Sequence, residues 1–222
     1  MAQAPKWSAV NDTYTLNIDN TSIEVIKGKG GRITHFSLDG NNILFWDGTH
    51  GGATLWPSPQ SSWSYWPLPA AFETNDAASI GLTGNKETLS LTTGIDNATK
   101  TSLRKTIWGN AETKAFTIKY QLYNKNESAR KYACWEVTRI PINSLTFFPK
   151  GSNYRISASN PGGPSDLGAT LENDTMLWYQ YDACYFPAGV LPGGFIFIVL
   201  PEGSEAAGPP GANFQGDPRA DV

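Results

Sequence analysis

The stretch AFTIKYQLYN, residues 115–124, alternates apolar and polar side chains along its whole length. One set is Phe116, Ile118, Tyr120 and Leu122, and the other is Thr117, Lys119, Gln121 and Tyr123. A period of two is typical of a β-strand, because successive side chains point to opposite sides of the sheet. We therefore expect the first set to meet a core and the second to meet solvent or a cleft, as in an antiparallel β-sandwich.

Strand patterns recur on both sides of this stretch, with polar turns between them. They are Tyr14–Ile18, Ser22–Ile26, Gly30–Leu38, Ile43–Trp46, Ala78–Leu82, Thr88–Thr92, Ser102–Trp108, Lys131–Ile140, Tyr154–Ala158, Met176–Tyr181 and Gly194–Leu200. Asp39 and Gly40 stand between two of these runs, which is a strong hairpin signal. Helical periodicity is nearly absent. The predicted fold class is therefore all-β, a large twisted antiparallel β-sandwich of ten or more strands.

Length and charge narrow the classes of function. The 222 residues predict one domain over residues 1–202, followed by a Gly/Pro/Ala-rich tail or strap over residues 203–222. The formal net charge is −3, and charged residues make up 17% of the chain without a basic stripe. This composition argues against nucleic acid and against an anionic membrane surface as partners. The most apolar run, residues 194–202, is far shorter than the ~20 residues of a membrane-spanning helix.

The first residues, MAQAPKW, look like the start of an exported chain after a small-residue cleavage site, so we expect a secreted or periplasmic protein. Two cysteines, Cys134 and Cys184, either form a disulfide or are two buried thiols; the sequence leaves both open. Five Asn-x-Ser/Thr sequences suit a polar β surface without establishing glycosylation. They begin at Asn11, Asn20, Asn97, Asn126 and Asn173.

Three stretches together resemble the aldose 1-epimerase, or galactose mutarotase-like, superfamily. They are GGRITHFSLDGNNILFW (residues 30–46), GGATLWPSPQ (residues 51–60) and the meander of residues 102–141, which contains K-T-I, Y-x-L-x-N and W-E-V-T-R. The resemblance spans roughly residues 14–200. It implies a supersandwich of twisted antiparallel sheets with an open sugar site on the concave face, and a small sugar or glycan as the partner.

The chain departs from this family where catalysis is concerned. Active members carry an acid histidine in an Asn-His-x-Tyr-Phe-type strand, whereas this chain reads CWEVTRI there, with Glu136 and no histidine. The carboxyl-terminal region is short for the family, so the last strands are expected to be missing, and only Glu202 stands where a base would be sought. Mutarotation is therefore not transferred by the resemblance.

Residues 51–69, GGATLWPSPQSSWSYWPLP, contain three tryptophans among four prolines. Sugar rings stack their C–H faces on flat aromatic rings, and prolines hold such a loop semi-extended. Trp63 and Trp66 are predicted to be sugar platforms, with a satellite core as the alternative. For Trp56, which abuts an apolar run, the core interpretation is favoured, although it stays a candidate for substrate binding.

Glu136 is predicted to share one strand face with Cys134 and Thr138. A carboxylate in mid-strand is costly unless it faces a polar cleft or meets a cation. Glu136 is therefore either half of a structural ion pair or a general base that also accepts from sugar hydroxyls. The candidate cations are Arg139, Arg32 and Lys105, and the first two are also candidates for substrate binding.

His50, on a Gly-flanked loop beside the tryptophan-rich segment, is either an exposed turn residue or the partner acid of Glu136. His35 lies inside a strand and is expected to be structural. The sequence has no H-x-H spacing and no nearby cysteine pair that would indicate a metal site. No cofactor is predicted.

Three functions follow from these candidates. The first is an aldose 1-epimerase-like enzyme that moves protons at the anomeric centre of a sugar through Glu136 and His50. The second is a non-catalytic carbohydrate-binding module. The third is a glycan-cleaving hydrolase or lyase, for which Tyr179, Tyr181 and Asp182 are the remaining candidates.

Overall fold

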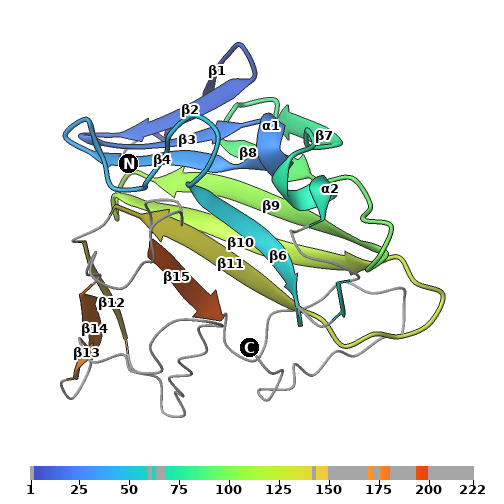
Figure 1. The fold of residues 1–222 in the computed structure, drawn as a ribbon. Helices are drawn as coiled ribbons and strands as arrows, with labels where there is room; N and C mark the ends of the chain where they lie inside the picture. The colour runs from blue at the N-terminus through green and yellow to red at the C-terminus, as the bar shows by residue number, and fades with distance from the viewer. Residues whose placement is uncertain are drawn as a thin grey trace.

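The computed structural model describes residues 3–59, 62–63, 69–141, 144–149, 170–172, 176–180 and 194–199. Within these residues the chain is an antiparallel β protein with two helices of four residues (Figure 1). The strands of the first half are β1 (Ser8–Val10), β2 (Thr13–Ile18), β3 (Thr21–Ile26), β4 (Ile33–Leu38), β5 (Asn41–Asn42), β6 (Ala53–Ser58), β7 (Ser79–Leu82) and β8 (Thr88–Thr92). Those of the second half are β9 (Thr101–Asn110), β10 (Ala115–Asn124), β11 (Ala133–Ile140), β12 (Leu145–Pro149), β13 (Thr170–Glu172), β14 (Met176–Gln180) and β15 (Gly194–Val199). The helices are α1 (Gly28–Gly31) and α2 (Ala70–Glu73).

Two sheets form the sandwich, and the predicted all-β class is confirmed. The larger sheet has the strand order β1-β2-β3-β4-β6-β11-β15, with β5 paired to β4, and the smaller has the order β10-β9-β8-β7. Strands β12, β14 and β13 form a third, three-stranded sheet. Neighbours in each sheet are antiparallel, which a chain of short strands and tight turns favours.

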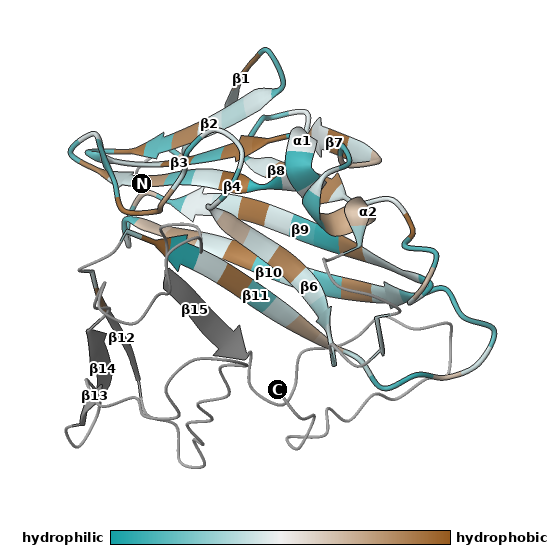
Figure 2. Cartoon of the chain, in the orientation of Figure 1, coloured by the Kyte–Doolittle hydropathy of each residue, from teal (hydrophilic) through white to brown (hydrophobic). Residues whose placement is uncertain are grey.

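The core lies between the two sheets and follows the predicted alternation of β10. Phe116 and Ile118 pack on one buried cluster, Tyr120 and Leu122 belong to a second, and Lys119 is exposed. Figure 2 shows apolar and polar residues alternating along β10 and β11. The first cluster joins residues of both sheets, namely Leu16, Ile23, Val25 and Ile33 with Leu89, Leu91 and Ile107. A period-two strand thus buries one face against the opposite sheet.

The hairpin at Asp39–Gly40 forms as predicted, with φ angles of 51° and 80°, but its second strand is shorter than expected. Only Asn41 and Asn42 pair with β4. The prediction of a strand over residues 43–46 is wrong, because the Asn42 side-chain oxygen accepts hydrogen bonds from the Phe36 and Leu44 amides and ends the ladder. Trp46 keeps a single β-bridge, to Gly51.

The predicted strand over residues 30–38 is divided, with α1 before β4. Gly30 has a φ of 73°, and a Cβ atom there would lie 2.0 Å from the Phe72 carbonyl oxygen. This close approach holds the turn of α1 against α2, where the Gly30 amide donates to the Asn75 carbonyl oxygen at 2.7 Å. Gly30, which was predicted to start a strand, therefore allows the close contact between the two helices.

The tryptophan-rich segment begins with a central strand that was not predicted from the sequence. β6 lies between β4 and β11, and its residues from Ala53 to Pro57 are all buried. A strand covered on both faces shows a continuous apolar run instead of alternation, so its period gives no signal. The predicted strand over residues 154–158, the tail over residues 203–222, Trp66 and Cys184 lie outside the described residues.

Candidate functional site

The pairing of β6 with β11 decides which side chains can meet. Trp56 is opposite Trp135, and Leu55 is opposite Glu136. Paired residues of an antiparallel ladder share a face, and neighbours along a strand alternate. Trp56, Trp135 and Arg139 therefore lie on one face of the larger sheet, while Glu136 lies on the other face, toward the smaller sheet.

The indoles of Trp56, Trp63 and Trp135 pack on one another. Ring centroids are 5.3 Å apart between Trp56 and Trp135, 5.8 Å between Trp56 and Trp63, and 6.0 Å in the stacked pair Trp63–Trp135. The three residues are only 2%, 8% and 9% exposed, in the order Trp56, Trp63, Trp135. Edge-to-face and stacked contacts of this kind stabilise a core.

The expectation that Trp63 is an exposed sugar platform is therefore wrong. One face of its ring is stacked on Trp135, and its indole N–H donates to the Pro57 carbonyl oxygen at 3.0 Å. For Trp56, the core interpretation is confirmed.

Arg32 is 2% exposed and is held by Glu73 of α2. Its Nη2 donates to Glu73 Oε2 at 2.5 Å, and its Nη1 donates to the Gly51 carbonyl oxygen at 3.1 Å. The other carboxylate oxygen, Glu73 Oε1, accepts from the Trp56 indole N–H at 2.8 Å. Glu73 thus ties α2 to the guanidinium and to the indole core, and it was not among the residues predicted from the sequence.

Arg139 converges on the same carbonyl oxygen, with Nη1 3.4 Å from Gly51 O. Its guanidinium lies 5.7 Å from the centroid of the Trp56 ring, and that of Arg32 lies 5.9 Å from the Trp46 ring. Desolvation lowers the pKa of Arg139, an effect that Glu73 opposes and Arg32 reinforces. Arg139, Trp46 and Glu73 are the partly exposed members of this group, which we call the arginine site: Arg32, Arg139, Glu73, Trp46 and Trp56.

Gly51 supplies the acceptor at the centre of the arginine site. Its φ is 102°, and a Cβ atom there would lie 2.0 Å from the Phe45 carbonyl oxygen. Gly48, in the same loop, also has a positive φ, of 91°, but a Cβ atom there would meet nothing within 4 Å. A substitution at Gly48 therefore meets only the strain of a positive φ, whereas a substitution at Gly51 meets that strain and a steric clash.

We expect Gly51→Ala to destabilise the fold by about 3 kcal/mol, and Gly48→Ala by only about 1 kcal/mol, because the first adds a backbone clash to the left-handed strain. Chemical denaturation of the two variants measures both values. Equal losses would mean that the loop relaxes around Gly51 and that the Phe45 contact is not restrictive.

Glu136 lies inside the sandwich, facing a buried lysine and a tyrosine. Lys105 and Tyr120 are register partners on β9 and β10, and the Lys105 ammonium donates to the Gly31 carbonyl oxygen at 2.7 Å. Burial raises the pKa of Glu136, and it lowers that of Lys105 to about 8 against the attraction of Glu136. Of the three cations considered from the sequence, Lys105 is the one on this face, and Arg139 is on the other.

His50 is an exposed turn residue. Its imidazole Nδ1 lies 3.3 Å from Asp47 Oδ2, and its side chain is 49% exposed. Backbone hydrogen bonds from His50 and Thr49 lower the pKa of Asp47 to about 2. In the described part of the chain no hydrogen bond or ion pair joins His50 to Glu136. The predicted acid and base are thus not brought together. His35, paired with Glu24 at 3.0 Å on adjacent strands, has the structural role expected.

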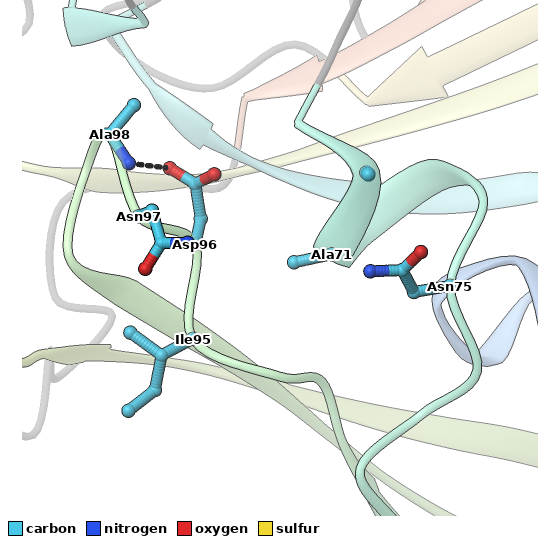
Figure 3. Close-up of a pocket in the computed structure, with 7 residues that line it drawn as sticks. Ala71, Asn75, Ile95, Asp96, Asn97 and Ala98 are labelled. Atoms are coloured by element: carbon cyan, nitrogen blue, oxygen red, sulfur yellow. Dashed lines mark hydrogen bonds between the residues drawn. The ribbon is translucent and has the colours of Figure 1, made fainter.

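A separate cavity of about 400 Å³ lies between α2 and the loop that joins β8 to β9 (Figure 3). The described residues that line it are Ala70, Ala71, Asn75, Ile95, Asp96, Asn97 and Ala98. This cavity could not be predicted from the sequence, because its two walls are about 25 residues apart in the chain and neither wall carries a motif.

Comparison of the chain with protein-family models, curated proteins and solved structures found no match. The resemblance to the aldose 1-epimerase superfamily therefore stays a prediction. Among the described residues, no three of His, Cys, Asp and Glu gather where they could hold a metal ion, and no helix has the length and apolar character needed to span a membrane.

Proposed function

We propose that the protein binds a saccharide at the arginine site, with Arg139 and Trp46 as the groups that touch it. The observation that supports this most is the convergence of two guanidiniums on the Gly51 carbonyl oxygen, each against an indole face. A guanidinium fork can donate to two adjacent hydroxyls, and an indole offers a surface for a C–H face. Carbohydrate sites combine these two kinds of group.

The charges of the arginine site do not require a strongly anionic sugar as the ligand. Glu73 contacts Arg32 directly, so the charge of that guanidinium is already matched inside the protein. Arg139 is a partly exposed guanidinium of the site, and Arg32 with Glu73 supports Gly51 and Trp56. A ligand would therefore meet the partly exposed surfaces of Arg139 and Trp46.

Binding is favoured over anomer exchange because the acid and base of the enzymatic hypothesis are apart. Proton transfer at an anomeric centre needs both groups within hydrogen-bond reach of the same sugar. Glu136 faces the interior beside Lys105, and His50 lies on an exposed turn. The non-catalytic carbohydrate-binding protein is therefore the function that this geometry supports best.

Arg139→Lys should lower saccharide affinity about tenfold, because a lysine keeps the charge but loses the planar fork. Calorimetric or NMR titration with methyl glycosides of galactose, glucose and mannose, and with a uronate, measures the change. Arg104→Lys is the matched control, since Arg104 is a partly buried arginine of β9 that donates to Ser90 on the smaller sheet.

Unchanged affinity in Arg139→Lys would contradict the proposed site. Preference for the uronate over all neutral glycosides would show that the site selects an anion. Polarimetry on the same sugars provides the enzymatic comparison, and accelerated anomer exchange that is lost in Glu136→Gln would replace the binding function with the epimerase-like one.

A further inference from the structure

The cavity beside α2 is lined by polar groups that do not belong to the arginine site. Its lining includes the small side chains of Ala70, Ala71 and Ala98, together with Ile95, which is 54% exposed. In Figure 3 the Ala71 methyl group projects from α2 toward the loop that holds Asp96. A volume of about 400 Å³ lies within the ~300–1,000 Å³ of small-molecule sites.

Asp96 supplies a buried carboxylate to this cavity. It is only 6% exposed, and its Oδ2 accepts hydrogen bonds from the Ala98 amide, the Thr99 amide and the Thr99 hydroxyl at 3.1, 2.7 and 2.8 Å. Its other oxygen, Oδ1, accepts no hydrogen bond from any residue that the structure describes. One oxygen thus builds the turn, while the other keeps its capacity to accept from a ligand.

Two exposed amides complete the lining. The side chains of Asn75 and Asn97 make no hydrogen bond to another described residue, so each can both donate and accept. Asp96 is the charged group among the described residues of the lining. The lining therefore has a formal charge of −1, which disfavours anionic ligands. A carboxylate, two amides and three methyl groups in one lining match a ring whose edge carries neighbouring hydroxyls.

The geometry points to a second ligand position in this cavity, one that takes the diol edge of a neutral saccharide. One ligand hydroxyl donates to Asp96 Oδ1, adjacent hydroxyls exchange hydrogen bonds with Asn75 and Asn97, and the ring lies over the alanine methyl groups. The choice of a saccharide rests on the proposed function. The location does not, because it depends on Asp96 and the cavity and on no residue of the arginine site.

The alanine methyl groups allow a direct test. In protein labelled with ¹³C at alanine methyls, the resonances of Ala70, Ala71 and Ala98 report on this cavity, and that of Ala133 on β11, which is not among the lining residues, is the reference. The probes are methyl glycosides of galactose, glucose and mannose, with choline as a cationic probe. We expect a glycoside, and not choline, to shift the three cavity resonances in a saturable manner.

Two variants separate the site from a general effect on folding. Ala70→Leu fills the cavity from an exposed position of α2 and should abolish the saturable shift, whereas Ala78→Leu, an exposed alanine outside the cavity, should leave it unchanged. Asp96→Asn keeps an oxygen for the Ala98 and Thr99 amides but presents an amide in place of the free carboxylate oxygen. It should weaken binding about tenfold, because a charge-assisted hydrogen bond is lost.

Each outcome bears on one site. Shifts that survive Ala70→Leu and Asp96→Asn, or that choline alone produces, would overturn the inference. Cavity shifts that persist in Arg139→Lys while calorimetric affinity falls would support two separate positions. If no glycoside or choline moves the three methyl resonances, the cavity is not a site for this class of ligand, whatever happens at Arg139.

Discussion

Glu73→Gln should be strongly destabilising, by about 3–5 kcal/mol, because it leaves the guanidinium of Arg32 buried without its counter-charge. Arg32 is 2% exposed, and its Glu73 partner is 16% exposed, so water cannot replace the lost carboxylate. The same change weakens the acceptor of the Trp56 indole N–H. We expect the polar attachment of α2 to the indole core to be lost, while Ala71 and Phe72 still pack in that core.

Equilibrium unfolding in urea measures the loss. The matched control is Asp19→Asn, which removes the carboxylate from an exposed pair in which Lys114 Nζ lies 2.8 Å from Asp19 Oδ2. Asn suits the left-handed φ of 51° at that position, and an exposed pair contributes little. Similar losses in the two variants would mean that burial of the Arg32–Glu73 pair has no special effect.

The stability of the protein should rise between about pH 8 and 10.5, relative to Lys105→Met. Burial lowers the pKa of Lys105 from 10.5 in an unfolded chain to about 8 in the folded one. Between these values the unfolded chain holds a proton that the folded chain has released, so raising the pH favours the folded state. The total gain is about 3 kcal/mol, with roughly 2 kcal/mol reached between pH 7 and 9.5.

Other groups around Lys105 make the comparison with a variant necessary. Burial raises the pKa of Tyr120, and it raises that of Cys134 to about 12, so both groups oppose the gain at alkaline pH. These contributions are present in the wild type and in Lys105→Met, and the difference between the two curves cancels them. Lys119→Met, on the exposed face of β10, is the control. A difference curve that is flat from pH 7 to 9.5 would contradict the assigned ammonium environment.

The strands whose faces differ in polarity could be predicted from the sequence. The two faces of β10 follow from its alternation, and Thr88–Thr92 has the predicted bounds. On β9, Lys105 lies between Leu103 and Ile107 on the inner face, and it was one of the three cations named for Glu136 from the sequence. The local sequence pattern is sufficient to predict the faces of a strand wherever one face is buried and the other is exposed to solvent.

The candidate site could be predicted only in part, because its members are joined by tertiary contacts. Arg32 and Arg139 were named, but the carboxylate that holds Arg32 is Glu73, 41 residues away on a helix of four residues. Such a helix is too short to show periodicity. The role of Trp63 was misjudged because a flat ring beside prolines looks the same in sequence whether it stacks on a sugar or on Trp135.

The mutual packing of Trp56, Trp63 and Trp135 has a consequence for spectroscopy. At 5.3–6.0 Å between ring centres, the excited states of the three indoles are electronically coupled, so the native fold carries a chromophore that none of the rings forms alone. Its circular dichroism arises from the relative orientation of the rings and disappears when that orientation is lost. The molecule therefore contains an intrinsic optical probe of the sheet face that β6 and β11 share.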